Sequence, residues 1–230
     1  MIAWQDAPAS LPEGERIYAI PDIHGALSKL RALHGMIAAD LVERPVEQPL
    51  LVHLGDYVDK GPNSRGVVEF LMAGSPCAAL HLRGNHEDMM LAALAREPGA
   101  EMDWLWCGGR ATLASWGATE EDWVDAVTAP QRDFLNATIF WHRAGGYFFT
   151  HAGIRPGVPL DAQAPDDLMR IRSEFLSSER DHGAVIVHGH TAGFDAVIRP
   201  NRICLDTAAW SGGPLTCGVF EGDRLGLLRA

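Results

Sequence analysis

The chain has 230 residues, of which 47% are hydrophobic and 21% charged. This composition is that of an ordinary globular protein, and it excludes the disordered, collagen-like and fibrous classes. The 30 acidic residues outnumber the 19 lysines and arginines, and the formal net charge of −11 repels a nucleic-acid backbone. We therefore expect no nucleic-acid partner.

Neither a membrane partner nor export is indicated. No segment has the roughly 18 consecutive apolar residues that a membrane-spanning helix needs. Residues 1–10 lack the basic and apolar regions of a secretory signal. The four cysteines are dispersed, without a close pair, as expected of a protein from a reducing compartment. The sequence thus predicts a cytoplasmic protein.

The first part of the chain predicts three successive units of strand, loop and helix. Strands are expected at 16–21, 49–54 and 78–83. Each is followed by a loop rich in Gly, Asp or Asn, and then by a helix at 27–37, 64–72 or 87–96. Ser64 is the expected N-cap of the second helix. Strands that alternate with helices indicate βαβ units and an α/β layered sheet.

The second part of the chain differs in character. Residues 101–144 contain five tryptophans and predict a mostly helical insertion, which we interpret as a lid or wall of a cleft. Its aromatic residues favour helix packing, with an aromatic wall for a peptide or nucleobase as the alternative. Strands are expected at 146–150, 184–188, 196–199, 202–205, 215–220 and 224–229, the last four as antiparallel neighbours. Because no linker interrupts the chain, we expect a single domain over 1–230.

Five short segments carry candidate metal ligands, and each follows a predicted strand. They are Asp22-Ile-His24-Gly25, Gly55-Asp56-Tyr-Val-Asp59-Lys60-Gly61, Gly84-Asn85-His86-Glu87, His151-Ala-Gly153 and Gly189-His190-Thr191. Any one of them alone is compatible with a simple turn or a helix cap. The carboxyl ends of strands in α/β sheets converge on one crevice, so their shared position favours a common site.

The residue types of these segments indicate the chemistry. Carboxylate, imidazole and amide groups without thiolates suit Mn, Fe, Zn or Mg. A single structural ion needs about four ligands, whereas six candidates with a shareable aspartate suit two ions about 3.5–4 Å apart.

The ordered motifs resemble those of the phosphoprotein phosphatase branch of the calcineurin-like metallophosphoesterases. They are most similar to the short bacterial and lambda-phage Ser/Thr phosphatases, and the resemblance runs from about Arg16 to the C-terminus. It implies an α/β fold: a four-layer αββα sandwich of mixed sheets, with a helical insertion and a di-metal centre between the loops.

The resemblance also implies roles for individual residues. Asp22, His24 and Asp56 match the ligands of one ion. Asp56 would bridge to a second ion, which is completed by Asn85, His151 and His190. His86 resembles the general acid, and Asp59 the group that orients it.

Phosphate-binding residues are implied less completely. The family usually has an arginine after the second aspartate of its second motif, and this chain has Lys60 there. Lysine supplies charge without the forked geometry of arginine, so the role either stays with Lys60 or passes to Arg65. Arg172 resembles the second phosphate-binding arginine, with an ordinary exposed helix arginine as the alternative. Asn85 is expected to contact phosphate as well.

The resemblance predicts a metal-dependent phosphomonoester hydrolase, in first place a Ser/Thr or dual-specificity protein phosphatase. Two divalent ions, with Mn first and Fe, Zn or Mg as alternatives, would activate a hydroxide for in-line attack. The substrate would be a phosphorylated protein or a small phosphoester. One alternative is a symmetrical dinucleoside tetraphosphate hydrolase. A remote alternative, encouraged only by Lys60, is a non-catalytic metal-stabilised interaction module.

Overall fold

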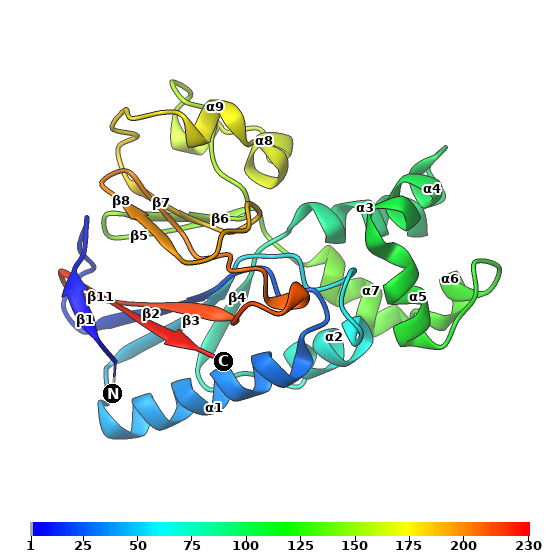
Figure 1. Ribbon diagram of the computed structural model, residues 1–230, viewed down its shortest axis with the longest axis horizontal. Coiled ribbons are helices and arrows are strands. Elements are labelled where there is room, and N and C mark those ends of the chain that lie inside the picture. The colour runs from blue at the N-terminus through cyan, green and yellow to red at the C-terminus, as the bar shows by residue number, and fades with distance from the viewer. Residues whose placement is uncertain (1) are drawn as a thin grey trace.

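Two β-sheets lie face to face at the centre of the protein in the computed structural model, which describes residues 2–230 (Figure 1). The six-stranded sheet has the order β1-β11-β10-β2-β3-β4, and the five-stranded sheet the order β5-β6-β7-β9-β8. Three neighbours in the first sheet are parallel, namely β2 (Glu15–Ile20), β3 (Gln48–His53) and β4 (Ala78–His81). Antiparallel strands complete it, namely β10 (Thr216–Glu221), β11 (Arg224–Arg229) and β1 (Trp4–Asp6).

The five-stranded sheet has the same mixed character. Its centre is parallel and consists of β6 (Tyr147–Thr150), β7 (Val185–His188) and β9 (Arg202–Cys204). Its two edges are antiparallel to their neighbours and consist of β5 (Trp141–Ala144) and β8 (Val197–Arg199). Both sheets therefore bring the carboxyl ends of three parallel strands to one edge.

Helices cover the outer faces of both sheets (Figure 1). The six-stranded sheet is covered by α1 (Leu27–Glu43) and α2 (Ser64–Met72), and the five-stranded sheet by α8 (Pro165–Arg170) and α9 (Ser173–Leu176). The remaining helices extend to one side: α3 (Asn85–Leu94), α4 (Ala100–Trp104), a π-helix (Leu105–Gly109), α5 (Arg110–Trp116), α6 (Trp123–Ala126) and α7 (Ala129–Asn136). Two 3-10 turns occur at Leu160–Ala162 and Ala209–Ser211.

Three separate apolar cores correspond to the three interfaces between four layers. Alternate residues of each strand face opposite sides, so Tyr18 packs with the helices of the outer face while Ile17 packs between the sheets. In the same way Phe149 lies between the sheets and Phe148 lies against α8 and α9. The αββα sandwich of mixed sheets is therefore confirmed.

Several sequence-based expectations are corrected by the structure. Residues 141–144, which we assigned to the helical insertion, form the edge strand β5. The short strand β1 and the helices α8 and α9 were not predicted. The four C-terminal strands do form two antiparallel pairs, but β8–β9 and β10–β11 belong to different sheets.

The expected N-cap of α2 is also wrong by one residue. The side chain of Asn63 accepts the Gly66 N–H and caps the helix. The Ser64 hydroxyl accepts the backbone N–H of Asp59 instead, at 3.0 Å. Because Asn63 caps the helix, the Ser64 hydroxyl is left to tie the start of α2 to the preceding loop.

No helix within residues 2–230 is both long and apolar enough to cross a membrane.

Candidate metal centre

All five predicted segments meet at one edge of the sandwich, where the parallel strands of both sheets end. From the six-stranded sheet, the chain after β2, β3 and β4 delivers Asp22, His24, Asp56 and Asn85. From the five-stranded sheet, the chain after β6 and β7 delivers His151 and His190. Two groups of side chains capable of holding a metal ion result, His24–Asp56–His86 and Asp56–His151–His190, and Asp56 belongs to both.

The first group surrounds one carboxylate oxygen of Asp56. His24 Nε2 lies 3.3 Å from Asp56 Oδ2 and 3.9 Å from Asp22 Oδ2. The Nδ1–H of His24 donates to the Val58 carbonyl at 2.7 Å, so Nε2 faces the carboxylates. Burial lowers the pKa of His24, but the attraction of Asp56 and Asp22 outweighs it and raises the value to about 9, and a cation bound there would take the place of that proton.

The second group surrounds the other oxygen of Asp56. His151 Nε2 lies 3.4 Å from Asp56 Oδ1, 3.2 Å from His190 Nδ1 and 3.1 Å from Asn85 Oδ1. The Nδ1–H of His151 donates to the Leu54 carbonyl at 2.9 Å. Burial lowers the pKa of His190 to about 2, and the neighbouring His151 acts in the same direction, so His190 is neutral.

These separations fit bound cations. Two ligand atoms that share an ion at about 2.1 Å lie roughly 3.0–3.4 Å apart at octahedral to tetrahedral angles. Most of the distances above fall in this range, and the two oxygens of Asp56 each face one group. The arrangement therefore fits two divalent ions with a carboxylate between them.

The charge balance of the site also favours cations. Asp22 and Asp56 are 3% and 1% exposed, and the loop after β9 adds a further buried carboxylate, Asp206. Burial raises the pKa of Asp22 to about 7, and repulsion from Asp56 adds to this. Burial and the nearby Asp22 raise the pKa of Asp206 to about 7 as well. Divalent ions at this position would relieve the repulsion among these acids.

The loops of the site have an unusual backbone. Several non-glycine residues adopt positive φ angles, namely His24, Asp56, Asp59, Lys60 and His190. Such conformations cost free energy and are found where the surrounding structure fixes a functional side chain. Two glycines permit the close approach: a Cβ on Gly84 would lie 2.1 Å from Asp56 Oδ1, and one on Gly189 would lie 2.2 Å from Asp22 Oδ1.

Next to the shared aspartate, His86 and Asp59 form a buried pair. His86 Nδ1 lies 2.7 Å from Asp59 Oδ2, and His86 Nε2 lies 3.9 Å from Asp56 Oδ2. The Asp59 carboxylate also accepts Trp104 Nε1–H at 3.0 Å and the Thr112 hydroxyl at 2.7 Å. The helical insertion thus reaches the site through a buried tryptophan that donates a hydrogen bond.

Two functional residues were missed by the sequence analysis. Glu87 accepts the backbone N–H groups of Asp56, Tyr57, Val58 and Gly84, and so fixes the loop that carries Asp56. It stands in the Gly84–Glu87 segment, but it was not among the residues to which a role was assigned from the sequence. Asp206 directly follows a predicted strand, which is the signal that marked the other segments.

The three basic candidates differ in position. Lys60 Nζ lies 2.9 Å from His24 Nε2, and Arg172 Nε lies 3.0 Å from His190 Nε2, so both reach the edge of the cluster. Each contact uses a nitrogen of a candidate ligand ring, and Lys60 has to give up its contact when an ion binds His24. Arg65 is not brought to the site, because its guanidinium forms a salt bridge with Glu69 on α2.

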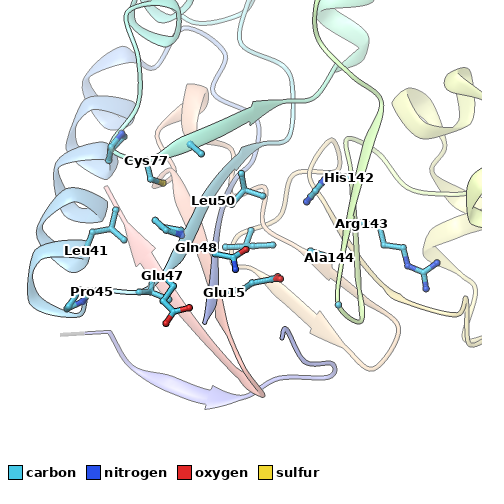
Figure 2. A pocket seen from close by; sticks show the side chains of 16 residues that line it. Glu15, Leu41, Pro45, Glu47, Gln48, Leu50, Cys77, His142, Arg143 and Ala144 are labelled. Carbon is cyan, nitrogen blue, oxygen red and sulfur yellow. The ribbon is translucent and has the colours of Figure 1, made fainter. Parts of the chain in front are cut away.

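A cavity of about 910 Å³ lies elsewhere, at the amino ends of β2 and β3 (Figure 2). It is lined by Glu15, Gln48, Cys77 and His142 among others. It contains none of the predicted site residues.

Acidic, imidazole and amide groups around a shared aspartate, beside a His–Asp pair, are the donor set of a metal-dependent phosphoesterase. Comparison with protein families agrees with this class, since the family model "Calcineurin-like phosphoesterase" matches residues 15–217. The chain belongs to this family.

The sequence identity to individual relatives is about one third, and each match covers only part of the two chains. The chain is 35% identical over 144 residues to a symmetrical bis(5'-nucleosyl)-tetraphosphatase of Methylococcus capsulatus, a match that covers 61% of this chain and 44% of the relative. It is 33% identical over 113 residues to serine/threonine-protein phosphatase 1 of Salmonella typhimurium, covering 49% and 42%. The chain thus spans less than half of the length of these curated relatives.

Among solved structures, a candidate diadenosine tetraphosphatase superposes with a TM-score of 0.69. The match covers 96% of this chain and 98% of that protein at 24% sequence identity, and it supports the fold.

Proposed function

We propose that this protein hydrolyses dinucleoside tetraphosphates symmetrically, cleaving the central phosphoanhydride bond to give two nucleoside diphosphates. The observation that carries the proposal is the likeness to the Methylococcus tetraphosphatase, which extends over 144 residues at 35% identity. The sequence motifs alone favour a Ser/Thr protein phosphatase and make this activity the alternative. The likeness to a protein phosphatase is shorter, at 113 residues.

We assign the metal ligands as the sequence predicts, with Asp22, His24 and Asp56 on one ion. Asp56, Asn85, His151 and His190 would hold the second. Divalent ions at these positions, Mn²⁺ being our first choice, supply activation of water and neutralisation of the phosphoryl oxygens when bound. Glu87 keeps the Asp56 loop in place, and the histidine Nδ1–H bonds to backbone carbonyls keep the rings oriented.

His86 is proposed to protonate the leaving group from Nε2. Asp59 accepts the Nδ1–H of the same ring and thereby fixes its orientation. The terminal phosphate of a departing nucleoside diphosphate is a far weaker base than a serine alkoxide. Anhydride cleavage therefore depends less on His86 than phosphomonoester cleavage does.

Lys60 and Arg172 are proposed to bind phosphate oxygens. Both are exposed, cationic and adjacent to candidate ligand rings. Arg172 offers two parallel donors, whereas Lys60 acts as a point charge. Asn85 has an amide N–H₂ group in addition to the oxygen that faces His151, so it can also donate to phosphate.

The second candidate function is dephosphorylation of phosphoserine or phosphothreonine in proteins. The likeness to serine/threonine-protein phosphatase 1 favours it, and the same residues would act.

We also propose a cytoplasmic location. Neither activity needs a disulfide, and the four cysteines are free, which suits a reducing compartment.

The test is a comparison of kcat/KM for diadenosine tetraphosphate and for a phosphoserine peptide, with Mn²⁺ present. We expect the dinucleotide to be preferred and ADP to be the only nucleotide product. A preference for the peptide would support the second candidate, and AMP plus ATP as products would contradict symmetrical cleavage.

His86→Asn tests the proposed acid. We expect kcat to fall by roughly 10²–10⁴ with the phosphopeptide and by less with the dinucleotide. His142→Asn changes a half-buried histidine on the edge strand β5 and is the matched control, expected to retain activity. Equal activity of His86→Asn and wild type would contradict the proposed role.

A further inference from the structure

A partly exposed tryptophan, Trp210, lies beside the candidate metal centre and has no role in the chemistry proposed so far. Its ring centre lies 6.5 Å from that of His24, with the two ring planes nearly perpendicular at 85°. Although it is a large aromatic residue, 44% of its surface is exposed. An exposed aromatic side chain next to a phosphate-binding centre is suited to contact the group that the phosphate carries.

The loop that carries Trp210 is held firmly in place. Lys29 on α1 donates to the carbonyls of Ala209, at 2.8 Å, and Gly213. The N–H groups of Ser211 and Gly213 donate to the carbonyl of Ala208, at 3.0 and 3.1 Å. The exposed ring is therefore mounted on a short, internally bonded 3-10 turn, and stacking on it costs little ordering of the loop.

A positive charge lies close to both the ring and the metal centre. Lys60 Nζ is 5.6 Å from the centre of the Trp210 ring and 2.9 Å from His24 Nε2. The ammonium group can attract a phosphate oxygen while the neighbouring indole contacts a planar group. An aromatic ring and a cation that both adjoin the metal centre fit a phosphate chain attached to a nucleoside.

We propose that Trp210 is a specificity-determining residue that stacks on a nucleobase of the dinucleotide substrate. This inference rests on the proposed function, because it concerns the base attached to the phosphate chain. Stacking on an aromatic side chain is tolerant of base identity, since every base has a π-face. Trp210 thus selects for nucleotides over base-free phosphoesters without selecting a particular base.

The first experiment compares a substrate that has a base with one that does not. In Trp210→Ala, we expect the ratio of kcat/KM for diadenosine tetraphosphate to kcat/KM for glycerol phosphate to fall by roughly 5- to 100-fold, mainly through KM. Trp210→Phe keeps an aromatic ring and should retain most of the ratio. Trp141→Phe, on the edge strand β5 where the Trp141 ring stacks on Phe148, should keep the wild-type ratio. A ratio in Trp210→Ala within about twofold of wild type overturns the inference.

The second experiment needs no turnover and therefore separates this inference from the proposed function. ADP and tripolyphosphate are titrated into metal-free protein while the tryptophan fluorescence is recorded. We expect ADP, but not tripolyphosphate, to quench the emission of wild type and Trp141→Phe, and this quenching to be lost in Trp210→Phe. Quenching that survives in Trp210→Phe, or that is absent in wild type, overturns the inference. Failure to hydrolyse diadenosine tetraphosphate, with Trp210-dependent quenching intact, would instead contradict the proposed function alone.

Discussion

At the scale of single residues, several hydrogen bonds hold the buried carboxylate of Asp59 in one orientation. Three side chains share it: the His86 ring, the Trp104 indole and the Thr112 hydroxyl. Its own N–H donates to the hydroxyls of Ser64 and Thr112. Since donors surround Asp59 on several sides, its carboxylate has little freedom to turn away from His86.

Removing one of these donors should weaken catalysis without unfolding the protein. Thr112→Val replaces the hydroxyl by a methyl group of similar size and deletes the 2.7 Å hydrogen bond to Asp59. A hydrogen bond to a charged group is worth roughly 1.5–3 kcal/mol, so we expect kcat to fall about 10-fold. Thr112→Ser keeps the hydroxyl and should stay close to wild type. Steady-state kinetics checks this, and equal kcat values for Thr112→Val and Thr112→Ser would contradict it.

The sequence could predict the residue types of the site but not all of their partners. Polar residues after apolar strands mark Asp22, Asp56 and His190 because strand ends converge. The contact between Trp104 and Asp59 joins residues 45 positions apart, and no local pattern records it. Arg65 was a candidate by proximity in sequence, yet a glutamate one helical turn away binds its guanidinium.

At the scale of elements, the site depends on how closely neighbouring loops approach. Gly84 precedes α3 and packs against the Asp56 loop, while Gly189 follows β7 and packs against Asp22. In both cases the glycine lies where a side chain would collide with a candidate ligand. Glycine is therefore required at these two positions because any larger residue would place its Cβ against a candidate ligand.

Gly84→Ala should consequently damage metal binding. Its Cβ would lie 2.1 Å from Asp56 Oδ1, so the carboxylate has to shift. We expect Mn²⁺ affinity to fall roughly 10- to 100-fold by calorimetry. Gly35→Ala is the control: it lies in α1 with no atom within 4 Å of the added Cβ, and it should leave affinity unchanged while stabilising the helix by about 0.5–1 kcal/mol. Unchanged Mn²⁺ affinity in Gly84→Ala would show that the loops can separate at no cost.

The elements that sequence analysis predicted are those with a clear apolar pattern. α2 was predicted with the bounds that the structure gives, Ser64–Met72. The missed strands β1 and β5 have three and four residues and lie at sheet edges, where exposed and half-buried positions leave no apolar run. β1 pairs with β11 from the other end of the chain, whereas β5 pairs with β6, the next strand along the chain.

At the scale of the whole molecule, stability should depend on a cluster of three histidines between α1 and the carboxyl ends of β3 and β4. His34 on α1 contacts His53 at the end of β3, with their Nε2 atoms 3.1 Å apart, and His53 stacks on His81 at 4.9 Å. Burial lowers the pKa of His34 and of His81 to about 4, and that of His53 well below its usual value. The three rings are therefore neutral in the folded protein.

This cluster should make the protein acid-sensitive. Between about pH 6.5 and 4 the unfolded chain binds protons at these histidines and the folded protein does not. The free energy of unfolding therefore falls with decreasing pH by up to about 1.4 kcal/mol per pH unit for each histidine. Above this range the contribution is fully present. Urea unfolding across the range should show a smaller slope for His81→Phe than for wild type, and an unchanged slope would contradict the explanation.

The central claim for the whole molecule is that loops from both sheets hold two divalent ions around one aspartate. Calorimetric titration of metal-free protein with Mn²⁺ tests it most directly. We predict two ions per chain for wild type and for the surface control Asp195→Asn, and roughly 10- to 100-fold weaker binding of both ions in Asp56→Asn. A single ion in wild type, or two ions bound as tightly by Asp56→Asn, would contradict the account.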